Sequence, residues 1–197
     1  GGFIRSSDRV DRPDVQLHML PLLFDDSGRD LKLMSNPGYS VHVCVLRPKS
    51  TGAVTITSAD PFAAPDIDYN FFADPDDSKV MVDGIRQARR ILAAKAFDEY
   101  QGEEIHPGAD CQSDEQIIEK VKEKVGLVYH PVGTCKMGTD EMAVVDPKLR
   151  VHGLEGLRVV DASIMPRLIS GNTNAPTIAI AEKAADMIIE QAVGLDN

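Results

Sequence analysis

The sequence has no tryptophan, few cysteines and fewer basic than acidic residues. The cysteine content and the charge each argue against a class of protein. Cys44, Cys111 and Cys135 form no CxxC pair and are odd in number, so neither a disulfide framework nor a zinc knuckle is indicated. Lys and Arg number 21 against 31 Asp and Glu, and the net charge of −10 argues against a nucleic-acid-binding or anionic-membrane surface.

Long apolar runs are also missing. None approaches the roughly 20 residues that a membrane helix needs, and no stretch resembles a signal peptide. We therefore expect a soluble, cytoplasmic protein that is at most peripheral to a membrane. The histidine and cysteine spacings at 130–135 and 106–111 match no zinc-ligand pattern, so no metal site is predicted.

What is present is an ordinary globular composition. The 197 residues are 43% hydrophobic and 26% charged, enough for one domain or one and a half. The chain opens GGFIRSSDRV, without Met and without a capped element, as if cut from a longer polypeptide.

The first third of the chain alternates in the manner of β-strands. Apolar residues alternate over 14–24 and 39–48 and, after the turn KSTG, over 52–58, so 39–58 predicts a hairpin. A short extended piece is expected at 65–72. Further on, the apolar run GLRVVD predicts a buried strand at 156–161.

Helical spacing begins after these strands. The Asp-Pro pair at 74–75 provides an N-cap and a first helical residue for a helix over 75–95. Ser113 and Gln116 form a capping box ahead of a second helix over 114–124.

A last helix is expected over 174–191. Its predicted inward face is formed by apolar residues at helical spacing, namely Ile178, Ala181, Ala185 and Ile188. Strands followed by helices, and then one strand and one helix, indicate an α+β fold with an antiparallel sheet.

Four polar residues are candidates for chemistry. His130 stands before Pro131 in a Pro/Gly turn that would hold it as a general base, although a surface or capping histidine is the simpler interpretation. Asn172 and Asn174 precede the last helix, whose N-terminus would stabilise an anion; ordinary capping by Asn174 is the alternative. Asp161 ends an apolar run and would bind a hydroxyl, or else serve as a cap or turn residue.

Taken together, these residues resemble the C-terminal part of the glucose–methanol–choline (GMC) oxidoreductases, which oxidise alcohols with FAD. The similar stretches are LRPKSTGAVTITSADPFAAPDIDYNFF at 46–72, YHPVGTCKMGTDEMAVVDPKLRVHGLEGLRVVDASIMP at 129–166, and SGNTNAPTIAIAEKAADMII at 170–189. The resemblance covers residues 14 to 189, with the three stretches in the family's order.

The resemblance implies a role for each matching position. His130 would be the catalytic histidine that takes the alcohol proton as hydride passes to flavin N5, and Asn172 would hydrogen-bond the substrate oxygen. Residues implied to contact FAD are Asp161 and Ala162, near the ribityl and diphosphate groups, and Asn174, Ala175, Pro176 and Thr177, at the helix start beside the isoalloxazine ring.

The resemblance also implies that part of the site is elsewhere. The family's Gly-rich FAD fingerprint, GxGxxG, is absent from this chain. We therefore assign 1–153 to substrate-binding-domain material and 154–197 to a strand and helix that complete an FAD-binding domain, whose N-terminal half would be the chain's main partner. Alone, the chain would expose the apolar faces of that strand and helix, which favours self-association.

Two functional hypotheses follow. The first is the C-terminal portion of an FAD-dependent alcohol dehydrogenase, inactive alone, which in the longer protein converts a primary alcohol to an aldehyde. The second is a stand-alone binding or interaction module without chemistry. Under the first hypothesis, the similarity to choline and aliphatic-alcohol dehydrogenases leaves both substrates open. The chain has few aromatic residues to form a cage for the quaternary ammonium of choline, which favours an aliphatic alcohol. Oxygen and quinone or another carrier remain open as the electron acceptor.

Overall fold

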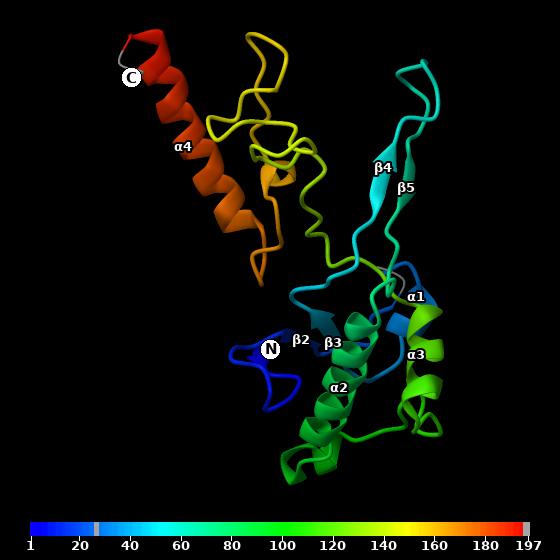
Figure 1. The fold of residues 1–197 in the computed structure, drawn as a ribbon. Coiled ribbons are helices and arrows are strands. Elements are labelled where there is room, and N and C mark those ends of the chain that lie inside the picture. The colour runs from blue at the N-terminus through cyan, green and yellow to red at the C-terminus, as the bar shows by residue number, and fades with distance from the viewer. Residues whose placement is uncertain (26–27, 195–197) are drawn as a thin grey trace. The chain divides into compact units, whose positions relative to one another are not determined.

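The computed structural model describes residues 1–25 and 28–194, which fold into two compact units (Figure 1). The first unit contains Gly1–Gly52 and Asp68–Gly126, and the second contains Ala53–Ile67 and the chain from Leu127 onward. Antiparallel sheets and helices together confirm the predicted α+β class. The division into substrate-domain and FAD-domain segments at 153/154 concerns the longer protein and stays a prediction.

The first unit is built on a three-stranded antiparallel sheet in the order β1–β2–β3. The strands span Gly2–Ile4, Val15–Leu20 and Ser40–Val45. β2 lies in the middle, and the expected strand over 14–24 ends at Leu20 because Pro21 cannot continue the ladder. The edge strand β1 was not expected from the sequence.

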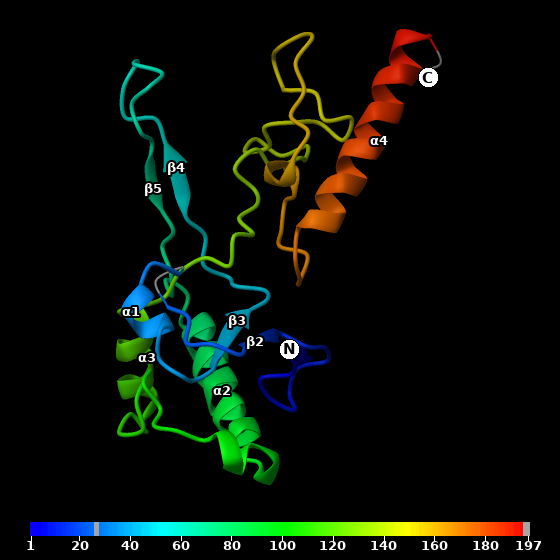
Figure 2. The ribbon, with the colours of Figure 1, turned by 180° about the vertical axis from the view of Figure 1, so that it is seen from behind.

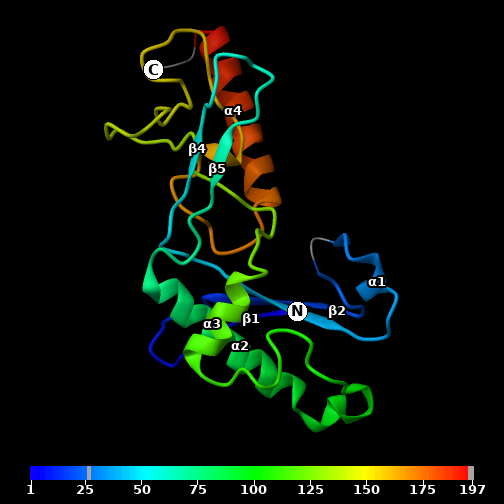
Figure 3. The ribbon, with the colours of Figure 1, turned by 90° about the vertical axis from the view of Figure 1, so that its right-hand side faces the viewer.

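Helix α2 (Pro75–Leu92) covers one face of this sheet (Figure 3). Its residue Gly84 faces the strands so closely that a Cβ there would lie 2.7 Å from Val43 Cγ1. α3 (Asp114–Lys122) packs against α2, and Ile117, fully buried, joins the two helices in one apolar cluster. Both helices lie where the sequence predicts them.

The predicted caps of these helices are present. The Asp74 carboxylate accepts a hydrogen bond from the Asp76 N–H, with Pro75 as the first helical residue. Ser113 and Gln116 make both bonds of the capping box at the start of α3. Two short helices, α1 (Leu31–Met34) and the 3₁₀ helix η2 (Lys95–Tyr100), complete the first unit and were not expected.

The hairpin expected over 39–58 is wrong. β3 pairs with β2, whereas β4 (Ala53–Thr55) pairs with β5 (Asp66–Asp68), the short extended piece expected at 65–72. The turn between the expected strands does not close a hairpin. Instead, the backbone N–H groups of Lys49 and Ser50 donate to the buried Asp77 carboxylate at 2.8 and 2.9 Å. These bonds tie the segment to the start of α2.

In the second unit, loops from Leu127 onward lie beside helix α4 (Asn174–Ala192), as Figure 2 shows from behind. Val145, Leu149, Ile164 and Ala184 are buried together there. The 3₁₀ helix η3 (Ala162–Ile164) supplies Ile164. This core is what positions the loop that carries His130.

The buried strand expected at 156–161 is wrong. The segment forms only an isolated bridge, Arg150 to Arg158, with flanking bonds such as Val159 N–H to Leu149 O at 3.2 Å. Val159 and Val160 are half-buried against the core. An apolar run becomes a strand only where a neighbouring strand offers a continuous ladder, and the segment around residue 150 offers only one bridge.

Helix α4 starts at the predicted residue and ends one residue later, but the face that packs on the core of this chain is not the predicted one. Ala184 is 1% exposed and Ile180 packs beside it, whereas Ile178 and Ile188 are 55% and 45% exposed. Isoleucine and alanine occur all around α4, so the sequence alone could not select the buried stripe. Among the described residues, no helix is both long and apolar enough to cross a bilayer.

Candidate functional site

His130 lies on a loop whose backbone is constrained on both sides. Tyr129, before it, has a φ of 61°, a left-handed conformation that non-glycine residues rarely adopt. Pro131, after it, restricts the backbone of His130 itself. Gly133 has a φ of 90°, which only glycine adopts without strain. The half-buried imidazole is therefore presented by a rigid turn.

The same loop is fastened to the core of the second unit by backbone hydrogen bonds. Cys135 N–H donates to Ser163 O at 3.1 Å, and Met137 N–H donates to Ile164 O at 2.8 Å. Because Ile164 is 1% exposed, these bonds connect the histidine loop to a buried anchor. They also bring the loop beside the segment that leads to α4.

Asn172 comes from the turn immediately before α4. Ser170, two residues before Asn172, also has a positive φ, 66°, so the chain turns sharply there. The Asn172 amide Nδ2 lies 2.8 Å from His130 Nε2. An amide nitrogen can only donate, so Nε2 acts as the acceptor and carries a lone pair. The structure thus joins the two residues predicted to be catalytic.

Thr173 is a third member of this group, and the sequence reasoning missed it. Its Oγ1 lies 3.0 Å from His130 Nδ1, and the residue is only 7% exposed. Since Nε2 of the neutral ring carries the lone pair, the proton is on Nδ1 and the threonine oxygen accepts it. A threonine between two candidate asparagines was the available signal.

The helix start differs from the alternative in which Asn174 caps it. Thr173 is the N-cap residue and Asn174 is the first helical residue, exposed like Ala175. Pro176 and Thr177, half-buried, complete the first turn, and Thr177 Oγ1 donates to Thr173 O at 2.7 Å. Thr173 makes no side-chain cap bond to α4, and the N–H groups of the first turn of a helix are directed away from it.

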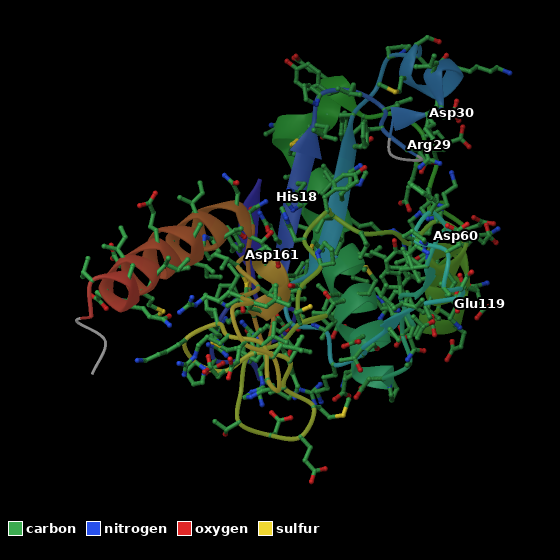
Figure 4. The ribbon with its side chains drawn as sticks, turned by 90° about the horizontal axis from the view of Figure 1, so that it is seen from above. His18, Arg29, Asp30, Asp60, Glu119 and Asp161 are labelled. Atoms are coloured by element: carbon green, nitrogen blue, oxygen red, sulfur yellow. The ribbon has the colours of Figure 1, made fainter. Side chains whose placement is uncertain are left out.

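Asp161, labelled in Figure 4, and Ala162 lie at the start of the 3₁₀ helix η3. Asp161 caps η3, its Oδ1 accepting from Ser163 N–H at 2.7 Å, and Ala162 is the first residue of that short helix. The capping alternative therefore describes what Asp161 does in the structure. Its predicted contact with a cofactor stays a prediction.

The remaining histidines lie outside this group. His152 Nε2 lies 3.1 Å from Gly138 O, and His42 stacks edge-on against Phe24. In the part of the chain that the structure describes, no three His, Cys, Asp or Glu side chains are arranged to hold a metal ion.

The group of His130, Asn172 and Thr173 has the parts of a proton-accepting site. Nε2 of the histidine is a base, and the amide beside it can donate to an oxygen bound at the same place. The second ring nitrogen, Nδ1, is hydrogen-bonded to Thr173 Oγ1. Such an arrangement can remove a proton from a hydroxyl group and stabilise the oxygen that is left.

Known proteins share both the sequence and the fold. A sequence model of GMC oxidoreductases matches residues 48–181. An alcohol dehydrogenase (acceptor) from Pseudomonas putida is 48% identical over 191 residues, which are 97% of this chain and 34% of that protein. An oxygen-dependent choline dehydrogenase from Escherichia coli is 50% identical over 188 residues, 95% of this chain and 34% of that protein. The chain spans about a third of the length of these curated relatives.

Solved structures of known oxidases also match the fold of this chain. Pyridoxine 4-oxidase from Mesorbium loti matches with a TM-score of 0.84 at 27% identity, covering 93% of this chain and 36% of that one. Formate oxidase of Aspergillus oryzae RIB40 also matches with a TM-score of 0.84, at 31% identity, covering 94% of this chain and 33% of that one.

Proposed function

The chain belongs to the GMC oxidoreductase family, and from that membership we propose that the intact protein oxidises a primary alcohol to an aldehyde with FAD as its cofactor. The observation that carries the proposal is the contact between Asn172 Nδ2 and His130 Nε2. In this contact an imidazole nitrogen and an amide donor lie side by side, which supports the proposal because removal of a hydroxyl proton requires a base and a donor.

In the proposed reaction, His130 and Asn172 share the substrate oxygen. An alcohol that enters between them would donate its O–H to Nε2 and accept a bond from Nδ2, replacing one direct contact by two. The O–H bond then breaks, its proton passes to Nε2, and the electron pair on oxygen forms the carbonyl as the C–H hydrogen leaves with its own pair. Asn172 stabilises the negative charge that develops on oxygen meanwhile.

The residues at the start of α4 suit the proposed cofactor. The chemistry that FAD supplies when bound is acceptance of the hydride. On this chain the N–H groups of Asn174 and Ala175 belong to the first turn of a 19-residue helix, where a partial positive charge favours an electron-rich partner. Asp161 and Ala162 would hold the cofactor further along, Asp161 through the carboxylate oxygen that does not cap η3.

The substrate class rests on chemistry and on the relatives together. The named relatives act on alcohols or on choline, itself a primary alcohol. This chain contributes no tryptophan and four tyrosines to any cage for a quaternary ammonium. We therefore favour an aliphatic primary alcohol.

The test is anaerobic flavin reduction in the intact protein. A primary alkanol, the matching secondary alkanol and choline are mixed in turn with the enzyme, and the loss of flavin absorbance is followed by stopped flow. The proposal predicts fast reduction by the primary alkanol and slower reduction by the other two. Reduction by none of the three would overturn it, and preferential reduction by choline would overturn the aliphatic assignment alone.

A further inference from the structure

Thr173 occupies the N-cap position of α4 without capping the helix. An N-cap threonine ordinarily has an extended backbone and accepts from the N–H of the second or third helical residue. Here Thr173 has φ −89° and ψ −9°, and its side chain makes no bond to the helix. The third helical residue is Pro176, which has no N–H to offer. The hydroxyl is directed to His130 instead.

The contact between Thr173 and His130 is shielded from water. Oγ1 and Nδ1 are 3.0 Å apart, and with 7% of Thr173 exposed, few water molecules can compete for either atom. On the opposite side of the ring, Asn172 Nδ2 donates to Nε2. Asn172 therefore selects the arrangement with the lone pair on Nε2 and the proton on Nδ1. The Thr173 oxygen, which can donate or accept, lies where it can accept that proton.

We propose that Thr173 is a positioning residue that fixes the Nδ1–H tautomer of His130 and so keeps Nε2 available as the base. This inference rests on the proposed function of His130. A histidine with its proton on Nε2 could not accept from Asn172 or from a substrate hydroxyl. Thr173 stabilises the Nδ1–H tautomer because its oxygen can accept the Nδ1–H, which a side chain without a hydroxyl could not do.

The contact serves both protonation states of the ring. When Nε2 takes a proton, Nδ1 keeps its own, so the bond to Thr173 Oγ1 is retained throughout. The threonine is itself held in place, since its carbonyl accepts from Thr177 N–H at 3.0 Å and from Thr177 Oγ1 at 2.7 Å. The orientation of the His130 ring is thus fixed through Thr173 by the first turn of α4.

The test compares Thr173→Val, which keeps the branched shape but loses the hydroxyl, with Thr173→Ser, which keeps the hydroxyl. The intact protein is labelled with ¹⁵N-histidine, and His130→Gln identifies the signals of His130. We expect a pyrrole-like Nδ1 and a pyridine-like Nε2 in the parent protein and in the serine variant. The valine variant should show averaged or exchanged shifts. An unchanged pattern in the valine variant, or a parent protein with its proton on Nε2, would overturn the proposal.

Flavin reduction supplies a second readout. Thr173→Val should slow the alcohol-dependent rate by about tenfold with the alcohol Kd little changed, and Thr173→Ser should restore most of it. Thr139→Val, the same substitution at an exposed position, should leave the rate unchanged. Because the tautomer is measured without substrate, it is independent of the proposed reaction. A protein that oxidises no alcohol yet shows the predicted tautomers would refute the function and not the positioning.

Discussion

Asn172 Nδ2 lies 2.8 Å from His130 Nε2, although 42 positions of sequence separate the two residues. The contact depends on two constrained turns, one at Tyr129 and one at Ser170, each with a positive φ. It also depends on the backbone bonds that attach the histidine loop to Ser163 and Ile164. The site is therefore assembled by local backbone geometry rather than by a sheet or a helix face.

Replacement of Asn172 by alanine removes the donor beside Nε2. The rate of flavin reduction by alcohol in the intact protein should fall by about a hundredfold, because a preorganised hydrogen bond to the developing oxygen charge is lost. Stopped-flow absorbance at saturating alcohol measures this rate.

Asn36→Ala is the matched control for that substitution. Asn36 follows α1 and its Nδ2 donates to Lys32 O at 2.8 Å, so its loss alters only an exposed turn. If both alanine variants reduce flavin at the parent rate, Asn172 has no part in the reaction.

Replacement of Gly84 by alanine should destabilise the first unit. Helix propensity would gain about 1 kcal/mol, but the new methyl would lie 2.7 Å from Val43 Cγ1 and 3.2 Å from Val15 Cγ1. Overpacking of this kind costs about 1–3 kcal/mol, and we expect the clash to outweigh the gain, leaving a net loss of about 1 kcal/mol. Urea unfolding monitored by circular dichroism measures it.

Gly102→Ala separates the packing effect from the general effect of removing a glycine. A Cβ at Gly102 meets no atom within 4 Å. Equal midpoints for the two variants, or a higher midpoint for Gly84→Ala than for the parent protein, would contradict the close packing of α2 on the sheet.

Asp146 should make the stability of the second unit depend on pH. Burial by itself raises the pKa of this carboxyl, but the backbone N–H of Arg150, the Arg150 side chain and the Lys148 N–H together hold the pKa below the ordinary value of 3.8. A carboxyl whose pKa is lowered by folding stabilises the fold above its unfolded pKa. That contribution should disappear as pH falls below 3.8 through the lower folded value.

The measurement is the free energy of unfolding of Asp146→Asn and the parent protein from pH 7 to pH 3. The difference should be constant down to about pH 5 and should shrink below the unfolded pKa of an aspartate, about 3.9. Asp186→Asn, at an exposed position on α4, is the control and should give no such trend. A difference that is the same at pH 7 and pH 3 would contradict the account of Asp146.

Elements with strong local signals were predictable from the sequence. The Asp74 cap with Pro75 and the Ser113–Gln116 capping box set the starts of α2 and α3, because each involves atoms only a few residues apart. β2, β3 and α4 followed from alternation and helical spacing.

Features that depend on distant partners were not predictable. The turn after β3 forms no hairpin because Asp77, 27 and 28 residues away, takes its N–H groups. The run at 156–161 forms one bridge instead of a strand, and α4 buries Ala184 rather than the predicted stripe, because in each case the packing partner decides.

The candidate site divides in the same way. His130 and Asn172 could be named from motifs that match a family, but motifs do not show that the two side chains touch. Thr173 was marked only by its place between two candidate asparagines, and a threonine before a helix normally suggests a cap. Its role appears only when the helix is seen to start at Asn174 with proline in its first turn.

The central claim is that His130 is the base that accepts the alcohol proton. The most direct measurement is the rate of anaerobic flavin reduction by a primary alcohol in the intact His130→Ala protein, with bound flavin verified by its spectrum. If His130 is the base, the rate should be lower by about a hundredfold to ten-thousandfold, the range that general-base catalysis provides. A flavin-loaded variant that is reduced at nearly the parent rate would contradict it.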